Sequence, residues 1–260
     1  MSEQAPAEYP EVTIVIPIYI TDNLNERLRW LQTAVESAAK QRYPNFRIEL
    51  WNDGSPSPRV MQTIKRLARR FHCDAFECTR EGHNTAGWIM NTTLDHCETP
   101  FVFWMGCDDE LHLGYLMACM MAWYTRAHEE GIKALGATTN CIKETRVNGE
   151  VFRQEFPMAS SPVYPVDLIR QYKYDEKISH GIDGGFQKHF IDQGYTFLKV
   201  EMPMYLYRFH EDQLSRGIHY DQDVKDLEEL SPELGMTLIK DIQDTKKQVM
   251  NRDSRRKKNR

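Results

Sequence analysis

The stretch FVFWMGCDDELH, residues 101–112, decides the fold class of this chain. It begins with five apolar residues, continues through Gly106 and Cys107, and then presents three acids, Asp108, Asp109 and Glu110. A short apolar run bounded by such residues is typical of a strand that is buried on both faces of a parallel sheet. We therefore expect residues 101–105 to form a buried strand that delivers carboxylates to one edge of the sheet.

Similar strands are expected upstream, separated by helices. VTIVIP at residues 12–17 is nearly all β-branched, and RIELW at residues 47–51 stops at turn-forming residues. Helical spacing of apolar residues follows each strand, and a short strand is expected at residues 75–78. The helices are expected at residues 28–39, 58–71 and 85–96. This alternation predicts an α/β fold with a doubly wound, mostly parallel, Rossmann-like sheet flanked by helices.

The second half of the chain does not continue the regular alternation of strands and helices. After a helix at residues 115–129, Asn148 and Gly149 have the composition of a type I′ turn. We interpret residues 134–156 as a strand and hairpin that add a small antiparallel part to the sheet. A helix at residues 183–193 and strands at 197–200 and 205–209 complete the prediction.

Composition excludes several classes of protein. With 41% hydrophobic and 27% charged residues over 260 positions, the chain can bury one large core. Its longest apolar stretch, residues 115–124, is far shorter than the roughly 18 residues that span a bilayer, and its first ten residues do not resemble a signal sequence. We therefore expect no transmembrane segment, a cytoplasmic location, and six reduced cysteines, because none forms a C-x-x-C pair.

Charge is unevenly distributed along the chain. The formal net charge of −5 argues against a protein that is coated for nucleic-acid binding. Positive charge is nevertheless concentrated in RDSRRKKNR, residues 252–260, after an acidic and helix-like stretch at residues 221–247. Such a tail is either a solvated terminus or a basic segment that binds a polyanion, and the sequence leaves both interpretations open.

The candidate functional residues lie where predicted strands end, because ligands of parallel sheets bind beyond the carboxyl ends of the strands. Asp53 either accepts hydrogen bonds from a base or ribose, or forms an Asx-turn. Asp108, Asp109 and Glu110 either begin a helix or hold a divalent cation, which prefers oxygen ligands. Two acidic sites at the strand ends of one sheet favour the cation.

Two further residues carry functional and structural alternatives. Asp183 lies in GIDGG and is either a general base or the N-cap of the following helix. His210, in YRFHEDQLS, is either structural or a contact to metal or phosphate.

Taken in order, these pieces resemble the family 2 glycosyltransferases, whose nucleotide-sugar domain has the GT-A fold. The matching segments are VTIVIPIYI, SAAKQRYPNFRIELWNDGS, Asn91 after a small-residue helix, FVFWMGCDDE, GIDGGFQKHFIDQGYTF and MPMYLYRFHEDQLS. The resemblance covers residues 11–215. It implies a nucleotide-sugar half at about 11–112 and an acceptor half at about 113–215. Outside it we expect an N-terminal tail at 1–10, a helical extension at 216–247 and a basic tail at 248–260.

The resemblance implies a role for each matching residue. Pro17, Tyr19, Asp53 and Asn91 would contact the nucleotide, and Asp108 would bind a Mn²⁺ or Mg²⁺ ion that bridges the diphosphate. His210 would contact metal or phosphate, and Asp183 would be the catalytic base. The family is inverting, so the acceptor hydroxyl would attack the anomeric carbon directly.

The sequence departs from the family pattern at three places. The usual D-x-D at the acidic strand end is G-C-D here, because Gly106 takes the first position. The usual E-D before the late helix is Ile182-Asp183, and N-x-G before Asn91 is replaced by HNTAG. Either Asp109 compensates as a metal ligand, or metal dependence is weakened, or activity is lost.

The sequence therefore predicts a metal-dependent inverting glycosyltransferase that uses a nucleotide-activated sugar, with uridine as the expected nucleotide. One alternative is a catalytically silent sugar-nucleotide-binding protein, which Gly106 favours. Another is a nucleotidyltransferase, against which the lack of a Gly-rich phosphate loop near Pro17 counts. The acceptor is a glycan, a lipid-linked sugar, a protein or a modified nucleic acid, bound by variable loops expected at residues 140–161 and from 215 onward.

A first prediction concerns Asp53. We expect Asp53→Ala to weaken nucleotide binding without unfolding the protein, because an acid in a strand-end turn contributes little to the core. Loss of charged hydrogen bonds to a base or ribose costs roughly 1.5–3 kcal/mol of binding free energy, measurable by calorimetry. Unchanged nucleotide affinity would mean that Asp53 only forms the turn.

Overall fold

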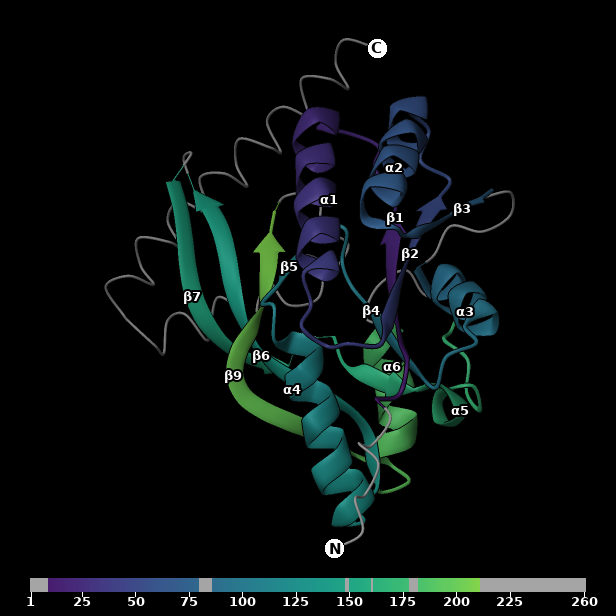
Figure 1. The fold of residues 1–260 in the computed structure, drawn as a ribbon, viewed down its shortest axis with the longest axis vertical. Coiled ribbons are helices and arrows are strands. Elements are labelled where there is room, and N and C mark those ends of the chain that lie inside the picture. The colour runs from purple at the N-terminus through teal and green to yellow at the C-terminus, as the bar shows by residue number, and fades with distance from the viewer. Residues whose placement is uncertain (1–8, 80–85, 148–149, 160, 178–181, 211–260) are drawn as a thin grey trace, which may run out of the picture. The chain divides into compact units, whose positions relative to one another are not determined.

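The computed structural model describes residues 9–79, 86–147, 150–159, 161–177 and 182–210. Within these ranges the chain forms one sheet with strand order β3-β2-β1-β4-β8-β6-β9-β5, and β7 pairs with β6 (Figure 1). Four strands at one end are parallel to one another. They are β1 (Val12–Ile18), β2 (Phe46–Asp53), β3 (Asp74–Cys78) and β4 (Phe101–Trp104). The parallel, doubly wound half of the fold is therefore as predicted.

Three helices connect the parallel strands: α1 (Leu24–Ala39), α2 (Pro58–Phe71) and α3 (Ala86–His96). α2 begins with a proline in its first turn, where the missing N–H has no helical partner to lose, and ends at His72 in the left-handed conformation. Because β1 pairs with both β2 and β4, the carboxyl ends of these three strands meet at one edge of the sheet. That edge holds the candidate site.

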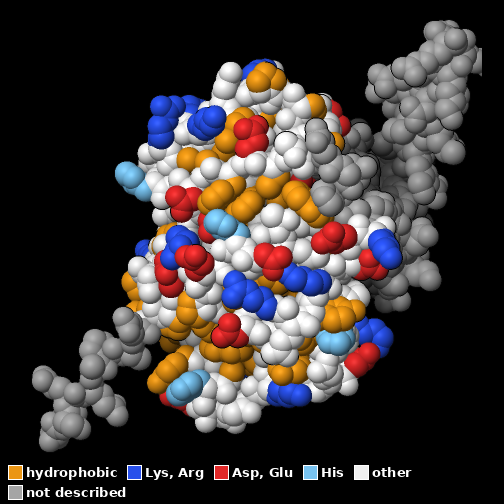
Figure 2. Space-filling view, turned by 90° about the vertical axis from the view of Figure 1, so that its right-hand side faces the viewer, with side chains coloured by type: hydrophobic (Ala, Val, Ile, Leu, Met, Phe, Trp, Pro, Cys, Tyr) orange, Lys and Arg blue, Asp and Glu red, His pale blue; other side chains and the backbone are white. Residues whose placement is uncertain are grey.

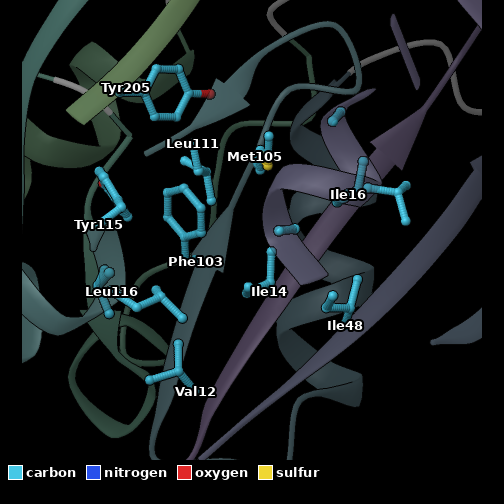
Figure 3. Close-up of a cluster of buried hydrophobic side chains, with 14 of the residues drawn as sticks. Val12, Ile14, Ile16, Ile48, Phe103, Met105, Leu111, Tyr115, Leu116 and Tyr205 are labelled. Carbon is cyan, nitrogen blue, oxygen red and sulfur yellow. The ribbon is translucent and has the colours of Figure 1, made fainter. Parts of the chain in front are cut away.

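Alternation along the strands supplies a core on each face of the sheet. Ile14, Ile16 and Phe103 pack against α1, α2 and α4 (Tyr115–Ala122), as Figure 3 shows for part of this cluster. Val15 and Trp104 point to the opposite face, where α3, α5 (Val166–Ile169) and α6 (Ile182–Ile191) cover them. A strand covered on both faces must be apolar on both, which is why β1 shows no polar alternation.

The other half of the sheet is mixed. β8 (Val163–Pro165) runs antiparallel to both β4 and β6 (Ala134–Val147), and β5 (Glu110–Leu111) runs antiparallel to β9. β7 (Glu150–Ala159) follows β6, so the antiparallel addition predicted from the sequence is present. Neither β5 nor β8 was predicted, because two or three residues carry no periodic signal.

The two predicted strands near the end of the described chain are in fact one. β9 (Thr196–Phe209) runs beside β6 in parallel and contains a register shift, in which Val200 pairs with Thr139 and Pro203 with Asn140. The extra residues form an irregularity in the strand, and Pro203 cannot donate a backbone hydrogen bond. These residues break the alternating pattern, and the sequence therefore indicated two strands.

The predicted helix at 115–129 is continuous in extent but changes its geometry. It is α-helical to Ala122 and then continues as a π-helix, η1 (Trp123–Glu129). No helix among the described residues is long and apolar enough to cross a membrane. Figure 2 shows acidic, basic and hydrophobic side chains interspersed over the face that it presents.

Backbone contacts divide the chain into two units, residues 1–145 with 152–209, and residues 146–151 with 210–260. The site described below lies within the first unit, apart from His210, which belongs to the second. Several expectations fall outside the described residues: most of the N-terminal tail, the turn at 148–149, the helix at 221–247 and the basic tail.

Candidate functional site

The ends of β1 and β2 are tied together by Ser55. Its hydroxyl accepts a hydrogen bond from the Ile20 N–H at 3.1 Å and donates one to the Ile18 carbonyl at 3.3 Å. The Ser55 N–H donates to Asn52 Oδ1 at 3.2 Å, so the residue before Asp53 also ties this turn. These bonds hold the loop after β1 against the turn after β2.

Asp53 and the residues expected around a nucleotide base lie at this shared edge. Asp53 is the last residue of β2 and is buried, and Gly54 follows with a φ of +68°, a conformation that favours glycine. Pro17 in β1 pairs with Trp51 in β2, and Tyr19 lies just beyond β1 with 40% of its surface exposed. The structure therefore brings Pro17, Tyr19 and Asp53 to one edge, and their contact with a nucleotide stays a prediction.

The acidic run does not begin a helix, because α4 starts at Tyr115 after Gly114. Glu110 instead begins β5, and residues 106–109 form a turn in which the Asp109 N–H donates to the Gly106 carbonyl at 3.2 Å. The helix-cap alternative for these acids is thereby removed.

Asp109 is buried and forms hydrogen bonds within the protein. Only 4% of the residue is exposed. One carboxylate oxygen accepts the Tyr205 hydroxyl at 2.7 Å, and the other accepts the Arg208 backbone N–H at 3.0 Å. Burial, followed by the charge of Asp108, raises the pKa of Asp109 to about 8. These contacts favour a structural role for Asp109 over the metal ligation expected for it.

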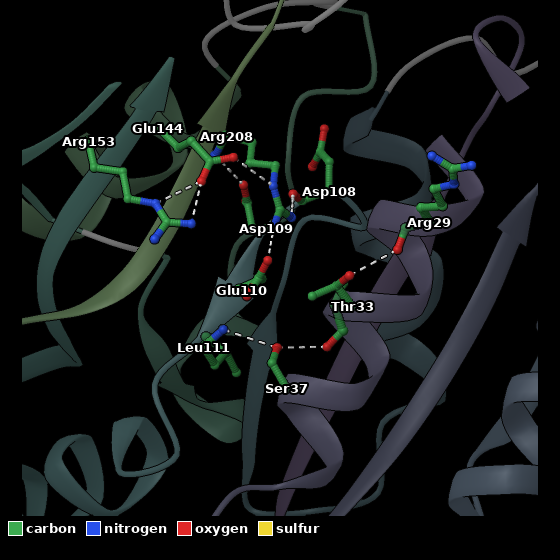
Figure 4. Close-up of polar contacts among 11 residues, drawn as sticks. Arg29, Thr33, Ser37, Asp108, Asp109, Glu110, Leu111, Glu144, Arg153 and Arg208 are labelled. Atoms are coloured by element: carbon green, nitrogen blue, oxygen red, sulfur yellow. Dashed lines mark hydrogen bonds and ion pairs between the residues drawn. The ribbon is translucent and has the colours of Figure 1, made fainter. Parts of the chain in front are cut away.

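Arg208 joins the acids to the rest of the sheet (Figure 4). Its side chain is 9% exposed and donates to the Asp108 carbonyl at 2.5 Å and to Glu144 at 3.3 Å, and it forms an ion pair with Glu110. Glu144 is also buried, and its second oxygen binds Arg153 at 2.8 Å. Burial lowers the pKa of Arg208 from its ordinary value, and the neighbouring carboxylates oppose that shift.

Asp108 is the more accessible of the two aspartates, and its partner comes from α1. Arg27 Nη1 lies 3.2 Å from Asp108 Oδ2, and the two side chains are 11% and 18% exposed. Arg27 lies in the first turn of α1 but is 81 residues away from Asp108 in sequence. Nothing in the sequence pattern pointed to this pair.

Asn91 binds the protein's own backbone. Its amide nitrogen donates to the Tyr174 carbonyl at 3.0 Å and to the Glu176 carboxylate at 2.7 Å. Its carbonyl oxygen accepts the Tyr174 N–H at 2.9 Å. The loop that contains residues 174–176 packs closely against α3. A Cβ on Gly87 would lie 2.7 Å from the Asp175 carbonyl oxygen. Asn91 therefore anchors this loop to α3, while its expected nucleotide contact stays untested.

Asp183 lies in the first turn of α6, which starts at Ile182. Its side chain reaches solvent, yet the surrounding protein restricts its hydration and raises its pKa. Burial raises the pKa of Tyr164 and of Tyr174, and the charge of the nearby Asp183 adds to both shifts. Tyr164 is on β8 and pairs with Val102 of β4, which places α6 over the strand that carries the acids.

The expected metal ligands do not form a cation site among the described residues. No group of three His, Cys, Asp or Glu side chains in these ranges is arranged to hold a metal ion. Asp109 accepts hydrogen bonds from Tyr205 and Arg208, and Asp108 forms an ion pair with Arg27. His210 follows β9 directly but belongs to the second unit. A guanidinium beside Asp108 would repel a divalent cation, so this donor set does not fit one.

Sequence reasoning missed the residues that surround Asp108 and Asp109. Tyr205 and Arg208 are three residues apart on β9, so the two-residue period of a strand places their side chains on opposite faces and no alternating pattern linked them. Arg27 and Glu144 gave no signal, because their roles depend on contacts between distant segments.

Comparisons with known proteins agree with this architecture. Residues 13–128 match the family model described as Glycosyl transferase family 2. S. aureus TarS 1-349 in complex with UDP is similar with a TM-score of 0.56 and 16% identity over 76% of this chain and 60% of that one. TarS 1-349 in complex with UDP-GlcNAc gives a TM-score of 0.55 and 15% identity over 78% and 60%. No curated protein sequence gives a significant match.

These findings first define a fold class. The mixed α/β architecture, with its mostly parallel sheet, flanking helices and antiparallel part, is GT-A-like, as predicted. Residues 13–128 then match the model of the family 2 glycosyltransferases, the family that the sequence resembled. The chain spans about three fifths of the TarS 1-349 chains that it matches.

The buried Asp109 generates a prediction about pH. Its pKa in the folded protein, about 8, lies above the ordinary value of 3.8, so the folded state binds the proton more tightly than the unfolded state. The resulting stabilisation is fully present below about pH 4 and is lost as pH rises towards 8. A single group changes the free energy of unfolding by at most about 1.4 kcal/mol per pH unit.

Urea unfolding of wild type and Asp109→Asn from pH 4 to 9 tests this. We expect wild type to lose stability relative to the variant as pH rises. Asp95→Asn, at an exposed ion pair with Lys173, is the matched control and should run parallel to wild type. Parallel curves for Asp109→Asn would show that Asp109 is ionised in the folded protein.

Proposed function

We propose that this chain is a glycosyltransferase that moves a sugar from a nucleotide-activated donor to an acceptor hydroxyl with inversion at the anomeric carbon. One observation carries the proposal: the segment with the family 2 pattern, residues 13–128, folds so that Asp53 ends β2 and Asp108 follows β4, the two strands that flank β1 in a GT-A-like sheet. The carboxyl ends of parallel strands are where such sheets bind nucleotides.

A uridine nucleotide is the donor that we propose. Two similar structures are complexes with UDP and UDP-GlcNAc, although their 15–16% identity to this chain establishes likeness of fold alone. In this chain Asp53 would accept hydrogen bonds from the base or ribose, with Pro17 and Tyr19 bordering the base. The acceptor is a hydroxyl of a glycan, a lipid-linked sugar, a protein or a modified nucleic acid.

Asp183 is the base in this proposal. As the acceptor oxygen forms its bond to the anomeric carbon, the proton of the hydroxyl passes to Asp183. The bond between the anomeric carbon and the diphosphate breaks, and the nucleoside diphosphate leaves with the electron pair. Restricted hydration raises the pKa of Asp183, and a base whose pKa approaches the working pH transfers protons more effectively.

A catalytically silent sugar-nucleotide-binding protein is the second candidate. Gly106 in place of the first acid of the family pattern favours it, because that acid would contact ribose or metal. Turnover of a donor that binds separates the two functions.

A screen of nucleotide sugars by thermal shift is the first experiment. A donor at 100 times its Kd stabilises the folded protein by about 2.7 kcal/mol. We expect UDP-sugars to raise the melting temperature and GDP-sugars to have less effect. If no nucleotide or nucleotide sugar binds, the proposed function is wrong. Binding without hydrolysis or transfer would identify the silent alternative.

Asp183→Asn tests the base. Asparagine keeps the shape of the side chain but cannot accept the proton, so we expect donor binding to survive and kcat to fall by roughly 10²- to 10⁴-fold. Asp192→Asn, at the exposed end of α6 where Asp192 pairs with Lys188, is the matched control and should keep normal turnover. A stable Asp183→Asn protein with near-normal kcat would remove Asp183 from the mechanism.

A further inference from the structure

Arg27 occupies the place where the family pattern leads one to expect a cation. It lies in the first turn of α1, the helix that follows β1, and contacts Asp108 at the end of β4. We propose that Arg27, oriented by Asp108, binds the diphosphate of the nucleotide donor in place of a carboxylate-bound metal ion. This inference rests on the proposed function and assigns the group that neutralises the leaving diphosphate.

The position of Arg27 suits an anion. The first turn of a helix carries the positive end of the helix dipole, and α1 is 16 residues long. Arg27 adds a full positive charge at that end, with only 11% of its side chain exposed. Its guanidinium lies 5.4 Å from the centre of the Trp30 ring and 3.2 Å from Asp108. These two contacts restrict the side chain before any ligand arrives, which lowers the entropy lost on binding.

A guanidinium can hold Asp108 and a diphosphate at the same time. It carries five N–H donors in one plane, and this geometry matches both carboxylate and phosphate oxygens. Asp108 then acts as a positioning residue, because it orients the guanidinium without touching the donor. A metal ion at the same carboxylate would have to displace Arg27 or lie beside its positive charge.

The space beside Asp108 excludes the missing acid of the family pattern. A Cβ on Gly106 would lie 2.4 Å from Asp109 Oδ2 and 2.9 Å from Asp108 Oδ1, closer than real Cβ atoms come. Asp109 cannot move away easily, because Tyr205 and Arg208 both donate to it. The strand end therefore has no room for a second metal-binding carboxylate at position 106.

Calorimetry with UDP and with uridine separates the diphosphate from the base. In EDTA we expect wild type to bind UDP with an affinity within about threefold of that in Mn²⁺. Arg27→Met, which keeps the length of the stem, should weaken UDP by about tenfold or more and leave uridine unchanged. Arg27→Lys should recover part of the loss, because the charge returns without the planar fork.

Arg29→Met is the matched control. Arg29 is exposed on the same helix, and Figure 4 shows it on the side of α1 that faces away from Asp109 and Glu110. The substitution removes the same charge two residues along, so UDP affinity should stay close to that of wild type. An equal loss in Arg29→Met would mean that Arg27 acts only through long-range charge, which overturns the proposal.

Asp108→Asn gives a result of opposite sign for the two kinds of site. If Arg27 binds the diphosphate, Asp108→Asn should leave UDP affinity in EDTA unchanged or increase it, because the amide oxygen can still accept a hydrogen bond from Arg27 while the negative charge beside the anion is lost. If Asp108 holds a metal, the same substitution should abolish a gain in affinity that Mn²⁺ confers. This measurement decides the question even if Arg27→Met does not fold.

Failure of the inference differs from failure of the proposed function. UDP binding that requires Mn²⁺ and is lost in Asp108→Asn would overturn the role of Arg27 and leave the glycosyltransferase proposal intact. Absence of both UDP and uridine binding in every buffer would overturn the uridine-donor proposal and the inference with it.

Discussion

The arrangement of the site depends on the buried guanidinium of Arg208. A charge removed from water is tolerated only when hydrogen bonds and opposite charges surround it. Arg208 meets this condition with the Asp108 carbonyl and the carboxylates of Glu110 and Glu144, while its backbone N–H binds Asp109. The hydrogen bonds and ion pairs of Arg208 thus fix the turn after β4, the short strand β5 and the position of β6 relative to β9.

Charge balance in this cluster explains the unusual proton affinity of Asp109. Four carboxyl groups, those of Asp108, Asp109, Glu110 and Glu144, face three guanidinium groups, those of Arg27, Arg153 and Arg208. Asp109 has only neutral donors on its oxygens and is more deeply buried than Asp108. Protonation of this one group makes the numbers of opposite charges equal, in keeping with its raised pKa.

The sequence predicted the elements that have a local repeating pattern. It did not predict contacts between residues that are distant along the chain. β1, β2, α2 and β4 were predictable because apolar runs and helical spacing are local signals, and their parallel order then placed Asp53 and Asp108 at one edge. β9 was divided in two by its irregularity at Pro203. The partners of the acids, Arg27 and Arg208, lie 81 and 100 residues away from Asp108 in sequence, so no motif could reveal them.

The departure at Gly106 is one part of a coupled set of residues. Tyr205 receives the Gly106 N–H at 3.4 Å and donates to Asp109, which fills the space that a side chain at position 106 would need. An acid placed at 106 would meet Asp109 and Asp108 at once, and repulsion among three carboxylates would add to the steric conflict. Gly106 is therefore required by the packing of Asp109. Its presence alone does not indicate a decayed enzyme, because a strand end rebuilt around Asp109, Tyr205 and Arg208 still leaves Asp108 and Arg27 at the edge where a nucleotide would bind.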